Sequence, residues 1–430
     1  MEFGGNYINL MNNLLKFVLA YVITLLVAST AMIAVHCIPK EKIVEQVRES
    51  IPILESEGIY DTRYYGLVLF RLDNFTDKTM LQLAVTPEQK SIVEEAMLNY
   101  KYVSKPNFEE LKAACSGEYD GMQRTEYSRY WHGYLVTLKP LLLFFSIRGI
   151  RVINYCLFLI LLTVLTFLSV KKIGTYFGIC LIISLFLTNF MMVPLSLQFS
   201  TCYIVSFISM ILILSFPSLT KNSMRLSVFL FTIGMITSYF DFLTAPMLPL
   251  CFSIMVVFLK KGNVINPTLF TVFLVCFAYL LGYGLMWSSK WGLAYLLTGY
   301  DVLSSAFGQA QAYTISEEVM SDSLLSLIEL AKNHKSGIIF SIVPIAICFA
   351  ASVVYIAKLP TQLIKDHIWM IVVMLIPVLW LLVMKNHTLI HYWFTWRNLV
   401  ASLLCLLLFI YRTHNVKIKN GQNSYSDSML

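Results

Sequence analysis

The sequence predicts an all-α polytopic membrane protein with about ten transmembrane helices and a long extracytoplasmic loop after the first helix. Three observations predict this fold: 57% of the 430 residues are hydrophobic, only 13% are charged, and the mean hydropathy is +0.69. Soluble proteins carry charge on about a quarter of their residues, so a soluble fold is excluded. The apolar excess extends along nearly the whole chain, which indicates many spans.

The first apolar segment, residues 14–37, is long enough to cross a bilayer, and we interpret it as an uncleaved first helix because many spans follow it. The other apolar segments cover residues 152–170, 174–193, 201–217, 226–240, 246–259, 267–287, 336–357, 368–384 and 395–411. Two of them, 226–240 and 246–259, are short and are separated by Asp241 and Pro246. This pair forms either two full spans or a re-entrant hairpin.

Basic residues predict the orientation, because Lys and Arg collect in short cytoplasmic loops. If every second loop lies on the same side of the membrane, that side holds Lys171, Lys172, Lys221, Arg225, Lys260, Lys261, Lys358 and Lys365. The tail adds Arg412, Lys417 and Lys419. The opposite short loops, 194–200 and 241–245, contain no basic residue. We therefore predict a multi-pass membrane protein with both termini cytoplasmic.

This orientation divides the chain into four parts. They are the N-terminus and first helix (1–38), an extracytoplasmic loop with amphipathic and juxtamembrane helices (39–150), a transmembrane bundle (151–412) with outer loops near 194–200, 241–245, 288–335 and 385–394, and a cytoplasmic tail (413–430). Sixteen of the 25 acidic residues lie between Glu41 and Glu126. The first outer loop is therefore the part best equipped for chemistry.

The acidic loop begins with an amphipathic pattern over residues 43–54, which predicts a helix that packs on the loop or on the membrane. Asp73 and Asp77 follow, four residues apart, so that one helix would place both carboxylates on one face. Asn74 with Asp77 three residues later is typical of a capped helix start, which explains Asp77 but not Asp73. Asp73 is therefore the preferred catalytic carboxylate; Asp77 is a further candidate, and Asp241 is the reserve candidate for the base.

Aromatic and basic residues gather where the loop returns to the bilayer. Tyr130, Trp131 and His132 form either an interfacial aromatic belt or a platform for a sugar or lipid, where the imidazole could bind a phosphate. Arg148 and Arg151 precede the second span on the side where basic residues are disfavoured. A phosphate or anionic lipid head group explains them, and so does simple snorkelling.

The later loops hold further isolated polar residues. Asp241 is a lone carboxylate among apolar neighbours, either functional or paired with Arg148, Arg151 or Arg397. Lys290 lies between two tryptophans and is most simply an interfacial anchor.

The histidines His387 and His391 are spaced to share a helix face, but no third zinc ligand is visible. Hydrogen bonds to a phosphate or an acceptor sugar, with Arg397 as the anion clamp, compete with a plain aromatic belt.

One apolar helix, a long acidic outer loop with an early carboxylate motif, an aromatic return to the membrane and about nine further spans resemble the GT-C class of membrane glycosyltransferases. The likeness in architecture extends over nearly the whole chain. The motifs at 72–77, 130–133, 238–241 and 387–397 also look similar to poorly characterised bacterial membrane proteins of surface-polysaccharide loci.

The resemblance implies inverting transfer of a sugar from a polyprenyl-phosphate donor to a glycan or lipid-linked acceptor. The reaction would take place at the outer face of the bacterial plasma membrane. An outer-loop aspartate is the general base of that class. This role falls to Asp73, although it follows the first span by about 35 residues, more than is usual in the class, so Asp61, Asp77 and Asp241 remain rivals.

The expected substrate-binding residues are Tyr130, Trp131, His132, Arg148, Arg151, Lys290, His387, His391 and Arg397. No cofactor is expected, although a divalent cation is compatible with the pattern, and nucleic acid is not an expected partner. The alternative functions are a polysaccharide polymerase or ligase and a flippase or transporter of polysaccharide precursors.

Overall fold

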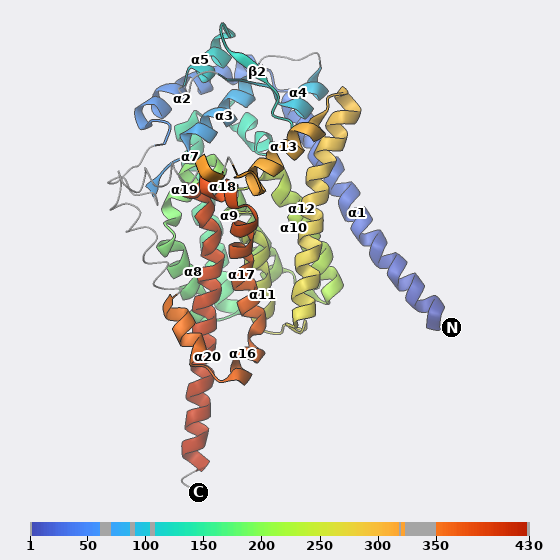
Figure 1. The fold of residues 1–430 in the computed structure, drawn as a ribbon, viewed down its shortest axis with the longest axis vertical. Coiled ribbons are helices and arrows are strands. Elements are labelled where there is room, and N and C mark those ends of the chain that lie inside the picture. The colour runs from blue at the N-terminus through green and yellow to red at the C-terminus, as the bar shows by residue number, and fades with distance from the viewer. Residues whose placement is uncertain are drawn as a thin grey trace.

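The computed structural model describes residues 2–60, 70–86, 91–103, 108–317, 320–322 and 350–427. Within them the chain forms two layers, a bundle of long helices and a smaller cap at one end of it (Figure 1). We define the cap as the described residues between Lys40 and Leu141. Helices dominate both layers, and the only described strands form one two-stranded antiparallel sheet.

Six helical segments are long and apolar enough to cross a membrane. They are Met11–His36 of α1 (Glu2–His36), α7 (Ile147–Lys172), α9 (Leu197–Ser215), α10 (Ser223–Phe240), α12 (Leu269–Thr298) and Tyr392–Val416, which lies mostly in α20 (Leu399–Asp427). Three shorter apolar helices are α8 (Thr175–Leu187), α11 (Leu248–Leu259) and α17 (Ile368–Val383).

The predicted class, an all-α multi-pass membrane protein, is confirmed by these helices. The predicted span 336–357 falls mostly outside the described residues, so the count of ten spans stays a prediction. The questioned pair 226–240 and 246–259 forms two separate helices, α10 and α11. All 12 residues of α11 are buried, so this helix packs inside the bundle.

Short helices connect the long ones. Outside the cap they are η3 (Phe190–Leu195), η4 (Pro217–Thr220), α13 (Val302–Thr314), α16 (Thr361–Asp366), α18 (Lys385–Ile390), α19 (Tyr392–Thr395) and η5 (Trp396–Asn398). Helix α12 continues to Thr298, so the first eleven residues of the predicted outer loop 288–335 are helical. The helix ends at Gly299, whose φ of 72° suits a residue without a Cβ.

The cap is built from short helices. They are η1 (Lys40–Lys42), α2 (Val44–Glu57), α3 (Asn74–Val85), α4 (Ile92–Leu98), α5 (Glu109–Ser116) and α6 (Leu135–Leu141), with strands β1 (Lys101–Val103) and β2 (Gln123–Thr125). Helix α2 confirms the predicted amphipathic helix, and its apolar face, with Val47, Ile51 and Leu54, is buried. The hydroxyl of Ser50 in α2 accepts a hydrogen bond from the N–H of Ile147 at 2.8 Å, which joins α2 to the start of α7.

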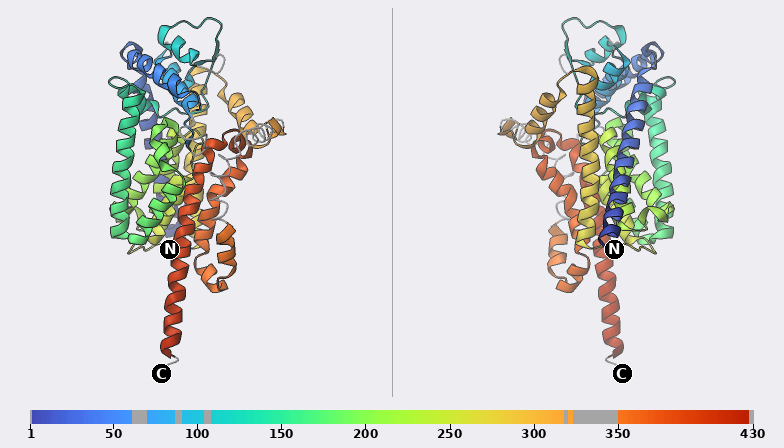
Figure 2. Two further views of the ribbon diagram at one scale, coloured as in Figure 1. Left: turned by 90° about the vertical axis from the view of Figure 1, so that its left-hand side faces the viewer. Right: turned by 90° about the vertical axis from the view of Figure 1, so that its right-hand side faces the viewer.

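The termini and the basic loops lie at the end of the bundle opposite the cap. Both views in Figure 2 place the start of α1 and the end of α20 there. The N–H of Lys261 donates to the carbonyl of Lys172 at 2.8 Å, and the ammonium of Lys260 contacts the hydroxyl of Thr220. These contacts bring three predicted cytoplasmic loops together.

Helices α10 and α12 pack with their backbones in direct contact. A Cβ added at Gly282 would lie 2.1 Å from the carbonyl oxygen of Phe231, and one at Gly234 would lie 2.2 Å from that of Tyr279. Such distances show that the two backbones touch without side chains between them. Small residues permit this approach in membrane bundles.

Candidate functional site

The predicted carboxylates Asp73 and Asp77 lie at the base of the cap, where α3 meets the bundle. The Asp77 side chain is fully enclosed. Its Oδ1 accepts hydrogen bonds from the hydroxyl of Ser196 at 3.2 Å and from the N–H of Leu197 at 3.1 Å. Leu197 is the first residue of α9, so the carboxylate satisfies a helix N-terminus. Burial raises the pKa of Asp77 to about 7 despite the nearby Arg151 cation.

Arg151 is committed to protein partners. Its Nη1 donates to both carboxylate oxygens of Glu57, at 3.0 and 2.8 Å. Its Nη2 donates to Asn74 Oδ1 at 2.8 Å and to Asp77 Oδ2 at 3.3 Å. These contacts link α2, α3 and α7. The sequence predicts Arg151 as a phosphate ligand, but the structure makes it the centre of a buried ion-pair network.

Asp73 is the N-cap residue of α3. Its Oδ1 accepts from the N–H of Thr76 at 3.2 Å and its Oδ2 from the Thr76 hydroxyl at 2.8 Å. The sequence interpretation that Asp73 has no capping role and that Asn74 caps the helix is wrong. The helix begins one residue earlier than that interpretation requires, so Asn74 is already helical and its amide donates to the Gly58 carbonyl at 2.7 Å.

The environment of Asp73 favours its protonated form more than water does. The side chain is 1% exposed, and burial raises its pKa to about 6. The Thr76 contacts and the nearby Arg71 cation oppose this rise. A carboxylate with this pKa is still mostly ionised at neutral pH, and it is a stronger base than an ordinary aspartate.

Near Asp73, the rings of Tyr60 and Trp393 contact the Arg71 guanidinium, and we call this arrangement the Arg71 clamp. The guanidinium carbon lies 4.4 Å from the ring centroid of Tyr60 and 4.8 Å from that of Trp393. Arg71 Nη1 also donates to the hydroxyl of Tyr392 at 3.0 Å. Residues from the cap and from the last part of the bundle therefore meet at Asp73.

Arg397 lies beneath this clamp and is fully buried. Its Nη1 donates to the carbonyl of Trp393 at 2.8 Å, and its guanidinium lies 4.1 Å from the ring centroid of Phe199. Its Nε and Nη2 have no hydrogen-bond partner in the described part of the chain, and neither does the hydroxyl of Tyr203. Asp73 and Tyr203 interact electrostatically with the Arg397 cation. A buried cation surrounded by hydrogen-bond donors that lack acceptors is suited to binding an anion.

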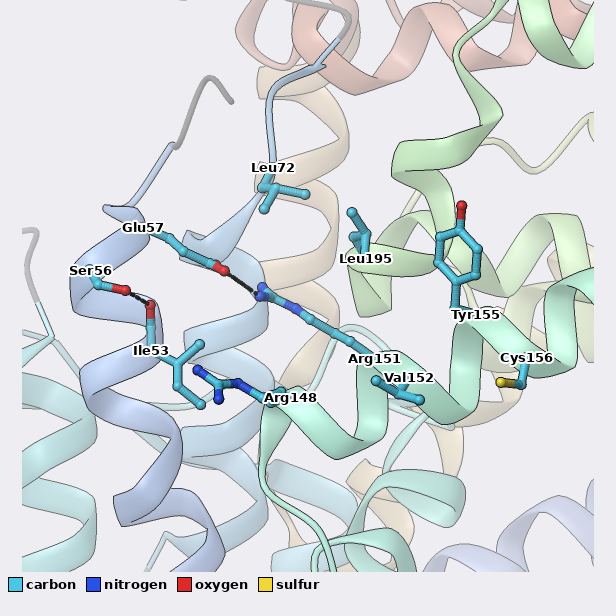
Figure 3. A pocket seen from close by; sticks show the side chains of 10 residues that line it. All are labelled: Ile53, Ser56, Glu57, Leu72, Arg148, Arg151, Val152, Tyr155, Cys156 and Leu195. Atoms are coloured by element: carbon cyan, nitrogen blue, oxygen red, sulfur yellow. Dashed lines mark hydrogen bonds and ion pairs between the residues drawn. The ribbon is translucent and has the colours of Figure 1, made fainter. Parts of the chain in front are cut away.

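A pocket of about 470 Å³ opens beside this network, between α2, α7 and η3 (Figure 3). The Arg151 side chain crosses it to reach Glu57, and apolar side chains such as Ile53 and Leu195 line it. Arg148 also lines it, is exposed, and makes no hydrogen bond or ion pair with the described residues. Leu72, which precedes Asp73, forms part of the wall.

A second hollow of about 350 Å³ lies between α6, α7, α9 and α10 and is mainly apolar. Leu141, Leu157 and Ile208 are among the residues that line it. Leu197 also lines it, and its N–H binds Asp77. The upper end of an apolar groove in the bundle therefore adjoins the carboxylate network.

The predicted residues Trp131, His132 and Lys290 are enclosed in the contact between cap and α12. Trp131 Nε1 donates to the carbonyl of Met286 at 2.6 Å, and the Lys290 ammonium donates to the carbonyl of Ala96 at 2.9 Å. The interpretation of Lys290 as an interfacial anchor is wrong because its side chain is fully buried.

His132 also has protein partners on both ring nitrogens. Its Nε2 lies 2.6 Å from the Tyr127 carbonyl oxygen and its Nδ1 lies 3.3 Å from the Tyr134 hydroxyl. Burial lowers the pKa of His132 well below its usual value, so the ring is neutral. Tyr130 stacks on Trp287 with ring centroids 6.0 Å apart. The structure therefore assigns these residues contacts within the protein.

His387 and His391 share a face, as the spacing predicts, with ring centroids 4.8 Å apart. Burial lowers the pKa of His391 to about 4, and its Nδ1 has no partner among the described residues. The ring of His391 lies 5.3 Å from that of Trp393, so it approaches the Arg71 clamp. The described residues contain no group of three or more His, Cys, Asp or Glu side chains placed to hold a metal.

Asp241 lies in the turn between α10 and α11 and is 4% exposed. Its Oδ1 accepts from the Cys202 thiol at 3.1 Å and from the N–H of Thr244 at 2.9 Å. It forms no ion pair with Arg148, Arg151 or Arg397, so the predicted buried pair is absent. Asp61, the remaining rival carboxylate, lies outside the described residues.

Sequence reasoning missed Arg71, Tyr203 and the link from Asp77 to Leu197. Arg71 stands two residues before Asp73, and this proximity was an available signal. Tyr203 lies within an apolar segment and carried no signal, because a tyrosine is ordinary in a span. The Leu197 contact uses a backbone N–H, which every residue except proline has.

Comparisons of the chain with family models, with curated proteins and with solved structures found no match. No relative therefore supplies a function. The function has to follow from the chemistry of the groups that the fold brings together.

Proposed function

We propose that this protein is an inverting membrane glycosyltransferase that moves a sugar from a polyprenyl-phosphate donor to a glycan or lipid-linked acceptor. The juxtaposition of Asp73 and Arg397 carries the proposal. Both groups lie next to Trp393 at the junction of cap and bundle: its ring contacts Arg71, two residues before the buried Asp73, and its carbonyl accepts from Arg397. Asp73 has a raised pKa, and two nitrogens of Arg397 have no partner among the described residues. A base and an anion site are the two groups that this transfer requires.

In the proposed step, the acceptor hydroxyl oxygen forms a bond to the anomeric carbon of the donor. The bond between that carbon and the phosphate oxygen breaks, and its electron pair leaves with the polyprenyl phosphate. Asp73 receives the acceptor proton. Arg397 stabilises the charge that develops on the phosphate, with the Tyr203 hydroxyl as a further donor.

The two hollows match the two parts of the lipid donor. The apolar groove beside Leu197 offers a surface for an isoprenoid chain. The pocket lined by Arg148 offers an exposed cation for the phosphate on its way to the site, and its wall includes Leu72, the neighbour of Asp73 in the sequence. In this proposal Arg148 meets the donor phosphate first, and Arg397 holds it during transfer.

The proposed orientation places the cap outside the plasma membrane and both termini in the cytoplasm. The gathering of Lys172, Lys260 and Lys261 at the end opposite the cap supports it. Lipid-linked sugars and surface glycans are then both within reach of the cap.

Release of polyprenyl phosphate tests this function and separates it from the alternatives. The purified protein would be incubated in lipid nanodiscs with a panel of polyprenyl-phosphate sugars and glycan acceptors. A transferase releases the polyprenyl phosphate and forms a new glycosidic bond, whereas a flippase releases none. A polymerase or ligase would instead use a polyprenyl-linked oligosaccharide.

Substitutions then test the site itself. Asp73→Asn keeps an N-cap side chain and removes the base, so we expect turnover to fall by about 10²–10⁴-fold. Arg397→Gln should reduce turnover strongly, and Arg397→Lys should recover only part of it because the planar fork is lost. Asp301→Asn, an exposed N-cap on α13, is the matched control. Near wild-type transfer by both Asp73→Asn and Arg397→Gln would refute the proposal.

A further inference from the structure

The turn between α10 and α11 holds a second cluster of buried polar atoms, separate from Asp73 and Arg397. Asp241 organises this turn, because its Oδ1 accepts from the N–H of Thr244 and from the Cys202 thiol. Leu243 within the turn has a φ of 62°, the left-handed region that a leucine rarely adopts. The fold thus holds this turn in a strained conformation deep in the protein.

Three oxygen atoms at this turn are buried and lack a hydrogen-bond partner within the described residues. They are Asp241 Oδ2, Thr244 Oγ1 and Asn398 Oδ1. Their residues are in direct contact, because Asn398 Nδ2 donates to the Thr244 carbonyl at 3.1 Å and Thr244 donates to Asp241. Gln198 Oε1 is a fourth unpartnered oxygen, one helical turn before Cys202 in α9.

An occupant is needed because buried polar atoms in native proteins are almost always satisfied. The negative charge of Asp241 narrows the choice of occupant. Asp241 accepts hydrogen bonds but has no ion-pair partner among the described residues, and a buried carboxylate without a counter-charge is unfavourable. Arg397 is the sequence neighbour of Asn398, but its described contacts are with Trp393, Phe199 and Trp396, not with Asp241.

The donor set fits a small metal cation. Asp241 Oδ2, Thr244 Oγ1 and Asn398 Oδ1 are all oxygens, which are the ligands of hard cations. Only one of them carries charge, so a monovalent ion neutralises the site. A divalent ion would leave a net positive charge among apolar neighbours such as Leu243 and Ala245, which are themselves buried.

We propose that a monovalent metal cation, Na⁺ or K⁺, binds between Asp241 Oδ2, Thr244 Oγ1 and Asn398 Oδ1. The ion ties the α10–α11 turn to the start of α20, because Asn398 directly precedes that helix. This site is independent of the proposed transferase function. Its role is to neutralise Asp241 and to hold the turn in its strained conformation.

Thermal unfolding of the purified protein tests the site. The melting temperature would be measured in NaCl, KCl and choline chloride at one ionic strength and one pH. Binding to the folded state raises the melting temperature with cation concentration, so we expect a saturable rise in NaCl or KCl above the value in choline chloride. Equal melting temperatures in all three salts would show that water or a proton fills the site, and would overturn the proposal.

Two variants locate the effect. Asp241→Asn should melt at the same temperature in all three salts. Asp73→Asn removes a different buried carboxylate and should keep the wild-type response. If Asp241→Asn does not fold, Thr244→Val removes one ligand oxygen at nearly constant volume and should raise the half-saturating cation concentration about 10-fold. An unchanged cation response in Thr244→Val, or in a folded Asp241→Asn, would contradict the site. None of these readouts depends on sugar transfer.

Discussion

Asp77 Oδ1 accepts a hydrogen bond from the N–H of Leu197 at 3.1 Å, across 120 residues of chain. The contact joins cap helix α3 to the first turn of α9, while Arg151 joins the same carboxylate to α7. The Asp77 carboxylate therefore connects the cap to the bundle. Asp73 in the same 72–77 motif accepts hydrogen bonds from Thr76, which lies in the same helix, and it faces the Arg71 cation.

This difference predicts that neutralising Asp77 lowers the stability of the fold, whereas neutralising Asp73 leaves the stability near that of the wild type. Asp77→Asn keeps the side-chain volume but removes the charge that faces Arg151 and weakens the bonds to Ser196 and Leu197. We expect a loss of about 1–3 kcal/mol in stability, seen as a lower melting temperature. Asp73→Asn should melt near wild type because asparagine also caps helices well. A wild-type melting temperature for Asp77→Asn would show that the contacts of Asp77 do not stabilise the packing of the cap on the bundle.

The proposed base also predicts a pH dependence of transfer. Asp73 must be ionised to accept a proton, and burial raises its pKa to about 6. The transfer rate should therefore be constant above about pH 7 and fall about tenfold for each pH unit below 6. Initial rates of polyprenyl-phosphate release from pH 4.5 to 8.5 measure this profile. A rate that stays flat down to pH 4.5 would exclude Asp73 as the base.

Periodicity and hydropathy predicted much of the fold. The long apolar segments became helices, and the spacing of Val47, Ile51 and Leu54 predicted the buried face of α2 correctly. These features depend only on residues close together in the sequence. The cap of α3 was ambiguous because Asp73 and Asn74 are both good N-cap residues. Helix geometry, and not residue type, decided between them.

The site was predicted less well because its contacts join distant segments. Lys290 between two tryptophans is typical of a membrane interface, but α12 continues past it and its ammonium binds Ala96. Arg151 was an apparently unpaired cation until α2 and α3 supplied Glu57 and Asp77. Local sequence reports which groups are present, whereas their partners depend on tertiary packing.

The buried position of Lys290 predicts that it does not bind the donor. Lys290→Met keeps most of the side-chain volume, and the Ala96 carbonyl keeps its second donor, Asn99 Nδ2 at 3.0 Å. Replacing a buried charge by an apolar residue of similar size is often neutral, so we expect stability to change by less than about 1 kcal/mol. The KM for the lipid donor should stay at the wild-type value. A large rise in this KM would return Lys290 to the phosphate site.

The proposed orientation predicts which surface positions react with a membrane-impermeant thiol reagent. Ser116 is exposed in the cap, and Ser218 is exposed in η4 at the opposite end of the bundle. Each would be replaced by Cys in a background that lacks the nine native cysteines. Intact cells should label Ser116→Cys and not Ser218→Cys, and permeabilised cells should label both. The reverse pattern would place the cap in the cytoplasm and exclude surface glycans as acceptors.

The contact between α10 and α12 predicts a sharp difference between two glycines of one helix. A Cβ at Gly282 would lie 2.1 Å from the Phe231 carbonyl oxygen, whereas a Cβ at Gly284 would have no atom within 4 Å. Gly282→Ala must therefore push the helices apart, and overpacking of this kind costs about 1–3 kcal/mol.

Gly284→Ala changes the same residue type in the same helix, so it controls for the effect of alanine on helix propensity, which by itself is favourable. We expect a lower melting temperature for Gly282→Ala and an equal or higher one for Gly284→Ala. Because Trp131 binds the Met286 carbonyl on this helix, displacement of α12 should also loosen the cap. Proteolysis of the cap should then be faster in Gly282→Ala. Equal melting temperatures for the two variants would mean that α10 and α12 do not touch through their backbones.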